Sequence, residues 1–155
     1  MLKPEHYETV LAQSADGRLY LPVPFDPAVV WNTATTHLGG SIGSERFRGV
    51  MTDFDGARGI PLAPGVIRDF GYHAGQPVKV ILVAEGPLRL DLAPDFAQAL
   101  SADPAVAAFG DALAPFYRKA FLKWVDSTKA RPDLRAARIA EVAAGLKAGR
   151  KALDR

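Results

Sequence analysis

The stretch from Asp55 to Val83 constrains the fold most, because its residues specify a turn, a strand, a helix, a second turn and a strand in succession. Asp55-Gly56 provides two residues that tolerate the positive φ angles of a hairpin turn. Pro64 fits the first turn of a helix, and Gly71 fits the left-handed position at its end. The β-branched run that ends at Val83 predicts a strand buried on both faces. This part of the chain is therefore predicted to be built mainly from strands.

A residue pattern similar to that of this stretch occurs earlier in the chain, as in an internal repeat. The matched positions are Asp16-Gly17 and Leu21-Pro22 in the first copy and Asp55-Gly56 and Ile60-Pro61 in the second. Each copy then runs into a Pro-x-Val motif followed by an aromatic residue. Two such units can close one small barrel about a pseudo-twofold axis, which removes exposed sheet edges. Chance also produces matches of this length, so both explanations stay open.

We therefore expect a small β-barrel domain of six or seven strands over residues 1–93. Besides the strands between Asp55 and Val83, strands are predicted at 8–13, 18–23, 45–52 and 88–92. A loop is predicted over 32–44, in which one short strand around Ser41-Ile42 stays open as an alternative. From Pro94 the apolar period changes to that of helices, and four short helices are predicted over residues 94–155. Trp124 is expected to be buried in their core. The fold class is α+β, a barrel followed by a helical C-terminal region.

Composition excludes several kinds of site. The 155 residues include no cysteine, which excludes disulfides, thiolate metal sites and thiol nucleophiles and fits a reducing cytoplasm. The first residues lack the apolar segment of a signal peptide, and no apolar run approaches the roughly 18 residues of a membrane span. We expect a cytoplasmic protein, a monomer or weak dimer, that needs no cofactor.

Catalytic and metal chemistry find little support in the residue pattern. The three histidines, His6, His37 and His73, lack ligand spacing to one another or to a carboxylate. The hairpin turn explains Asp53 to Gly56 better than a Mg²⁺ loop does. The glycine-rich segment from Gly39 to Ser44 lacks a following Lys-Ser/Thr or helix, so we expect a mobile loop rather than a phosphate cradle. We predict no catalytic or metal-ligating residues.

Charge is distributed unevenly. Residues 1–115 hold 8 Lys/Arg and 13 Asp/Glu, a net −5, whereas residues 116–155 hold 11 and 4, a net +7. The candidate anion- or partner-binding residues are Arg118, Lys119, Lys123, Lys129, Arg135 and Arg138, with Arg131 among them. Such residues form either a solvated helix face or a patch for nucleic acid, a phosphate-bearing ligand or an acidic protein surface. The acidic first part of the chain limits nucleic-acid binding to a weak, salt-sensitive interaction.

A known family is recognisable in these motifs. Ile60-Pro61, the helix over 66–71 and the Gly75-x-x-Val-x-Val pattern resemble a small bacterial barrel domain of unknown function. That domain usually precedes a YdeI/OmpD-associated, or bacteriocin-protection-type, helical domain. The second part resembles this helical domain at Leu113-Ala114-Pro115, Arg118-Lys119, Phe121-Leu122-x-Trp124-Val125, Lys129 and Arg135-Ala136-Ala137-Arg138-Ile139. Phe116-Tyr117 stands where the family commonly has Ser-His, and Asp133-Leu134 where it has Glu-Thr, so roles of those side chains are lost here.

The resemblance implies a function without a reaction. The family name implies an association with envelope stress and antimicrobial-peptide tolerance. The strand–Pro–helix–Gly–strand pattern also resembles half of an AbrB-type swapped barrel, which binds DNA as a dimer. Our first hypothesis is a non-enzymatic binding or stress-tolerance protein of the YdeI-like type. The alternatives are a nucleic-acid binder that uses the basic helices and, third, an enzyme of unknown reaction.

Overall fold

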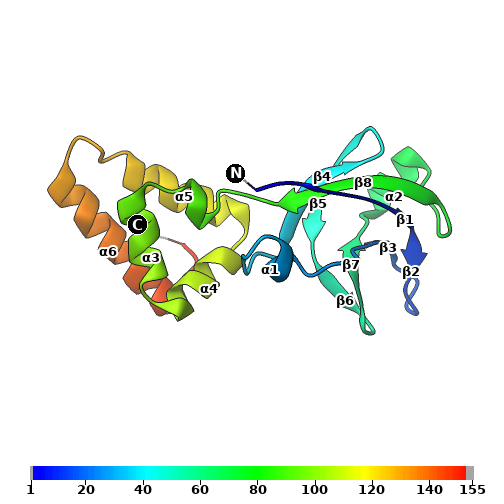
Figure 1. The fold of residues 1–155 in the computed structure, drawn as a ribbon, viewed down its shortest axis with the longest axis horizontal. Coiled ribbons are helices and arrows are strands. Elements are labelled where there is room, and N and C mark those ends of the chain that lie inside the picture. The colour runs from blue at the N-terminus through cyan, green and yellow to red at the C-terminus, as the bar shows by residue number, and fades with distance from the viewer. Residues whose placement is uncertain (1, 153–155) are drawn as a thin grey trace. The chain divides into compact units, whose positions relative to one another are not determined.

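The computed structural model describes residues 2–152 and shows an α+β protein made of two compact units (Figure 1). The β unit comprises residues 2–32 and 36–84, and the helical unit comprises residues 33–35 and the chain from Glu85 onward. The boundary predicted between residues 93 and 94 lies inside the helical unit, between the 3-10 turn η1 (Arg89–Asp91) and α3 (Pro94–Ser101).

The β unit holds eight strands in two four-stranded antiparallel sheets. The first sheet has the order β1-β8-β4-β5, and the second has the order β2-β3-β7-β6. The strands are β1 (Glu5–Val10), β2 (Ala12–Gln13), β3 (Leu19–Pro22), β4 (His37–Ile42), β5 (Glu45–Val50), β6 (Thr52–Phe54), β7 (Ala57–Pro61) and β8 (Pro77–Ala84).

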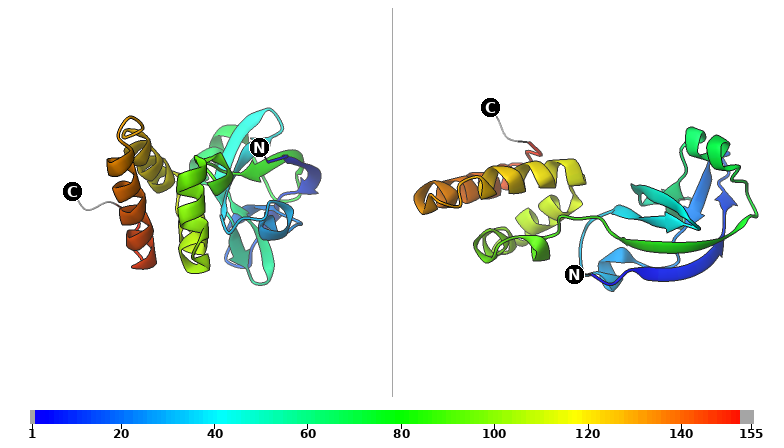
Figure 2. Two further views of the ribbon diagram at one scale, coloured as in Figure 1. Left: turned by 60° about the vertical axis from the view of Figure 1, so that its left-hand side comes forward. Right: turned by 90° about the horizontal axis from the view of Figure 1, so that it is seen from above.

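The prediction of one closed barrel with six or seven strands is therefore wrong. Two segments that we expected to be single strands are interrupted at the buried residues Leu11 and Met51. Each segment begins in the first sheet and ends in the second, which divides the eight strands between two sheets (Figure 2). The AbrB-type assignment stays a prediction.

The two copies found in the sequence have the same topology. β1, β2, β3, α1 (Pro27–Val30) and β4 are followed by β5, β6, β7, α2 (Pro64–Phe70) and β8 in the same order. Each sheet is symmetric, with equivalent strands at its centre and equivalent strands at its edges. The echoed residues Leu21 and Ile60 face each other where β3 pairs with β7. The repeat predicted from the echo is confirmed in its topology, and it includes a fourth strand that the echo did not reveal.

The loop predicted over residues 32–44 is wrong from His37 to Gly40, whereas the short strand left open at Ser41-Ile42 is the end of a longer strand. β4 occupies His37–Ile42 and pairs with β5 on one side and β8 on the other, and Gly43-Ser44 forms the turn of the β4–β5 hairpin. Glycine is required at position 40, where φ is +157° and a Cβ atom would lie 1.8 Å from the Ile81 carbonyl oxygen. Close backbone approach, rather than mobility, explains the glycine at position 40.

The stretch from Asp55 to Val83 is largely as predicted. Asp55 and Gly56 have φ of 55° and 92°, and Gly71 ends α2 in the left-handed conformation. β8 differs from the prediction, because it is buried on one face only. Val80 and Leu82 are buried, whereas Ile81 between them points to the exposed face.

The strand predicted at 88–92 is also wrong. These residues form η1, in which the Leu88 amide donates a hydrogen bond to the Asp91 carboxylate at 2.8 Å. Leu88 is buried, and Leu92 packs against the core of the helical unit. The alternation of apolar and charged residues therefore serves a helical turn here.

The helical unit contains the four helices expected from the sequence, α3, α4 (Pro104–Ala112), α5 (Pro115–Asp126) and α6 (Pro132–Lys147). Each begins with a proline, whose missing N–H group is no loss in a first turn. Their apolar sides share one core of buried residues, namely Phe96, Leu100, Val106, Leu113, Phe121, Val125, Ile139, Val142 and Leu146. None of the helices within residues 2–152 has the length and apolar character needed to traverse a bilayer.

Candidate functional site

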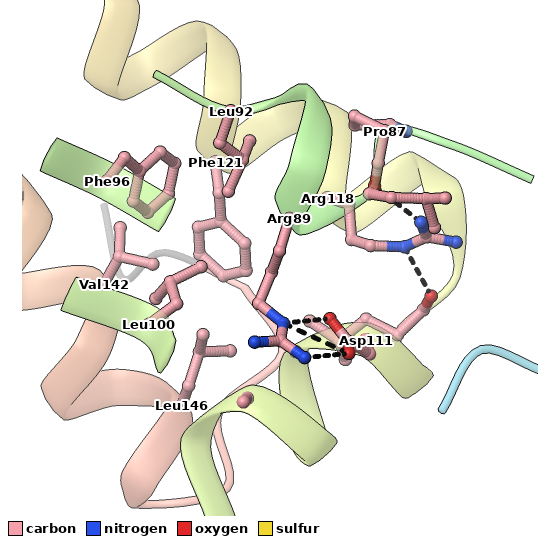
Figure 3. A pocket seen from close by; sticks show the side chains of 14 residues that line it. Pro87, Arg89, Leu92, Phe96, Leu100, Asp111, Arg118, Phe121, Val142 and Leu146 are labelled. Carbon is pink, nitrogen blue, oxygen red and sulfur yellow. Dashed lines mark hydrogen bonds and ion pairs between the residues drawn. The ribbon is translucent and has the colours of Figure 1, made fainter. Parts of the chain in front are cut away.

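Arg118, the first candidate anion-binding residue, makes intramolecular hydrogen bonds that stabilise the fold. Its guanidinium donates hydrogen bonds to the Leu113 carbonyl at 3.0 Å and the Pro87 carbonyl at 2.6 Å (Figure 3). It also donates to the Thr35 hydroxyl at 3.3 Å. Burial lowers the pKa of Arg118. The guanidinium therefore holds the start of α5 to segments far away in the sequence and is not part of an open surface.

A second arginine, which sequence reasoning missed, lies beside it. Arg89 binds Asp111 of α4 through Nε and Nη2 at 3.0–3.2 Å (Figure 3). Its Nη1 donates to the Ser101 hydroxyl at 2.8 Å. The Asp111 side chain is only 7% exposed. An arginine inside an otherwise apolar Leu-Arg-Leu segment was the available signal for this pair.

Arg89, Asp111 and Arg118 border an apolar cavity in the helical unit (Figure 3). Phe96 and Phe121 are among the core residues that line it. The space measures about 30 Å³, far below the several hundred Å³ that is usual for pockets that bind organic ligands. This cavity is a small gap in the packing and has no room for an organic substrate.

Arg135 is also committed to the fold. Its side chain is 12% exposed and forms ion pairs with Asp95 of α3 at 2.6 Å and Asp126 of α5 at 3.1 Å. One residue of α6 thus joins three helices. The hydrogen bonds from Arg135 lower the pKa of Asp95 to about 2.

This shift predicts a pH dependence of stability. The pKa of Asp95 lies below its ordinary value of about 4, so the ion pair stabilises the folded state above pH 4 and the effect is lost as the pH falls toward 2. Asp95→Asn should therefore lower the melting temperature at pH 7, and its difference from the parent protein should shrink near pH 2. Thermal unfolding at both pH values checks this. Asp133→Asn, at an exposed position in the first turn of α6, is the control. A constant difference for Asp95→Asn would contradict the assignment.

Arg138 and Trp124 form a contact on the side of the helical core. The guanidinium carbon lies 4.6 Å from the centroid of the indole ring, and Nη1 donates to the Trp124 carbonyl at 2.7 Å. Trp124 packs against the core but is only partly buried. The prediction of a buried core tryptophan is thus correct only in part. Trp124 contacts the helical core, and the Arg138 guanidinium lies over its ring.

Three of the six candidates, Lys119, Lys123 and Lys129, are exposed and have no ion-pair partner among the described residues. Lys119 and Lys123 lie one turn apart on α5, and Phe116 lies one turn before Lys119. We call these three residues, Phe116, Lys119 and Lys123, the α5 ridge. Phe116 is 75% exposed, and the ridge lies opposite the buried residues Phe121 and Val125. Lys129 follows in the loop before α6.

His6 and His73 lie on the surface, and His73 contacts only the neighbouring Ala74 carbonyl through its ring. Between residues 2 and 152, no three His, Asp or Glu side chains are placed to hold a metal ion.

A family model described as "Bacteriocin-protection, YdeI or OmpD-Associated" matches residues 89–149. No curated protein matches the chain. The matched segment begins at Arg89 and includes all four helices of the helical unit. Of the motif residues in this segment, Arg118, Arg135 and Arg138 make intramolecular contacts, whereas Lys119 and Lys129 are exposed. Residues 89–149 are therefore similar to the YdeI/OmpD-associated, bacteriocin-protection family, as the sequence motifs indicated.

Proposed function

We propose that this chain is a non-enzymatic binding protein whose helical unit binds an anionic partner through the α5 ridge. One observation carries the proposal. Four arginines of the helical unit are engaged by carboxylates, carbonyls and an aromatic ring, namely Arg89, Arg118, Arg135 and Arg138. Lys119 and Lys123, by contrast, face solvent without an acidic partner among the described residues. Adjacent unpaired cations repel each other, and an anion that binds both relieves this repulsion.

The family match supports this assignment, because its printed description concerns protection and association rather than a reaction. A role in stress tolerance of the YdeI-like type and a location in the cytoplasm belong to the same proposal.

Nucleic acid is the second candidate partner. Lys129 and Arg131 carry positive charge on from the end of α5 into the loop before α6, which favours a long polyanion. The two rings beside the ridge are less favourable, because Arg138 covers Trp124 and Lys151 lies 5.4 Å from the centroid of Tyr117. Base stacking on aromatic faces contributes strongly to single-strand binding. We therefore expect weak binding without sequence preference.

A charge reversal tests the role of the ridge. Lys119→Glu with Lys123→Glu should weaken low-salt binding of poly-L-glutamate and of single- and double-stranded oligonucleotides by roughly tenfold or more, because phosphate and carboxylate contacts are electrostatic. Fluorescence anisotropy of the labelled polyanions at low and near-physiological salt measures the effect. Lys3→Glu with Lys79→Glu makes the same charge change at exposed positions of the β unit and should have little effect. Equal losses for the two double variants would contradict the proposed function. Tight, sequence-dependent binding at the higher salt would favour nucleic acid.

A further inference from the structure

Phe116 is the residue of the α5 ridge that an electrostatic role leaves unexplained. It lies at the start of α5, and its ring packs edge-on against Tyr117 with the centroids 5.4 Å apart. This contact supports the ring from one side while three quarters of the residue stays exposed. A large apolar side chain held outward in line with two lysines gives α5 an outer side that is both apolar and cationic.

We propose that the α5 ridge docks on the surface of an anionic lipid bilayer, with Phe116 entering the boundary between headgroups and acyl chains and with Lys119 and Lys123 on the headgroups. The inference rests on the proposed function and names the partner class of the same site. Helices that lie on membranes combine apolar and aromatic residues with lysines in this way.

Three observations favour a bilayer over a folded macromolecule. The ridge is the outward side of a helix, so it is convex and matches a broad surface that can deform around it. The exposed charges on the ridge are lysines, which are strongly hydrated and remain among headgroups. Arg89, Arg118 and Arg135, whose fork geometry suits phosphate, are engaged within the helical unit. The Trp124 and Tyr117 rings are covered by cations, so Phe116 is the aromatic group of α5 that is available for insertion.

The charges near the ridge permit this approach. Asp126, the acidic residue of α5, is paired with Arg135. Each lysine close to an anionic membrane strengthens binding about fivefold, and burial of one aromatic side chain adds roughly tenfold or more. Three such residues give peripheral, reversible binding that weakens with added salt.

Vesicle sedimentation with the full chain tests the proposal. We expect binding to vesicles of phosphatidylglycerol and phosphatidylcholine and little binding to phosphatidylcholine alone. Phe116→Ala should reduce the bound fraction at limiting lipid about tenfold, and Phe116→Trp should restore binding and shift its fluorescence to shorter wavelength on contact with the vesicles. Val29→Ala removes a similarly exposed apolar side chain, 79% exposed in α1 of the β unit, and should leave binding unchanged. Lys119→Ala with Lys123→Ala should lower vesicle binding about 25-fold. Lys119→Arg with Lys123→Arg keeps both charges and should preserve vesicle binding.

The outcomes separate this inference from the proposed function. If the chain binds polyanions in a salt-sensitive way that depends on Lys119 and Lys123 but does not bind vesicles, the bilayer proposal is wrong and the partner is an acidic macromolecule. Vesicle binding that is indifferent to Phe116→Ala overturns insertion and therefore the inference. Sedimentation velocity without lipid shows whether the chain self-associates. Self-association that depends on the α5 ridge and prevents vesicle binding would identify a second copy of the chain as the occupant and would also overturn the inference. No ridge-dependent binding to any polyanion or vesicle overturns both proposals.

Discussion

Gly40→Ala is expected to destabilise the β unit severely, by roughly 3–5 kcal/mol, which is the range of the strongest single-residue effects. A Cβ atom at position 40 would lie 1.8 Å from the Ile81 carbonyl oxygen and 2.7 Å from its carbonyl carbon. Both atoms are backbone, so a side-chain rotation cannot relieve the overlap. β4 pairs with β5 on its other edge, and movement away from β8 would break that ladder as well. Denaturant unfolding followed by circular dichroism measures the loss.

The neighbouring Gly39 provides a matched control. It lies on the same strand without a positive φ, and an added Cβ would meet its nearest atom, the Phe47 carbonyl oxygen, at 3.9 Å. Gly39→Ala should therefore change stability by about 1 kcal/mol or less. Similar unfolding midpoints for the two variants would show that β4 and β8 are not as close at position 40 as described.

Asp111→Ala is expected to destabilise the helical unit by about 2–4 kcal/mol, because it leaves the Arg89 guanidinium beside an apolar cavity without its carboxylate. The lower part of that range reflects the exposure of Arg89, whose side chain is 33% exposed. Arg89→Met combined with Asp111→Leu should recover much of the loss, since a buried ion pair often contributes little more than a well-packed apolar pair. Thermal unfolding followed by the helical circular-dichroism signal compares the variants.

A surface ion pair serves as the reference for this experiment. Asp69→Ala removes the partner of Arg68, and both of these side chains are mostly exposed. Its effect should be about 0.5 kcal/mol or less. If Asp111→Ala has an effect as small as Asp69→Ala, solvent screens the Arg89–Asp111 pair and the cavity region is wetter than its apolar lining indicates.

Local signals in the sequence were sufficient for most helices and for one hairpin. Asp55-Gly56 and Gly71 identify positions where an ordinary side chain would be strained, and a proline marks the first residue of each helix of the helical unit. The echo of Leu21-Pro22 in Ile60-Pro61 pointed to a repeat because both dipeptides lie in equivalent central strands. Such features depend on neighbouring residues alone, so they can be recognised before the fold is known.

The errors arise where distant partners decide the structure. β4 is rich in glycine, which has low strand propensity, and it becomes a strand because β5 and β8 supply hydrogen bonds on both sides. The segment around Arg89 has the alternation of a strand, yet Asp111 and Ser101 engage its arginine in a helical unit.

The candidate site shows the same limit. Helical periodicity placed Arg118, Arg135 and Arg138 near the surface, but it does not reveal whether a long side chain folds back to a carbonyl or a carboxylate. Lys119 and Lys123 were identified together with them, although only the structure separates the exposed lysines from the engaged arginines.

The order of strands in the first sheet has a consequence for folding during synthesis. β1 pairs with β8, and Glu5 faces Leu82, so the first strand of the β unit acquires its partner only when the last strand of that unit has emerged from the ribosome. Pairing across such sequence distances slows folding and leaves nascent strands exposed. The side chains of His6 and Glu8 place polar and charged groups on one side of β1, which discourages association with strands of neighbouring nascent chains in the interval. The helices α3 to α6 form contacts mainly with one another, so the β unit, whose strand pairing spans greater sequence distances, is synthesised before the helical unit.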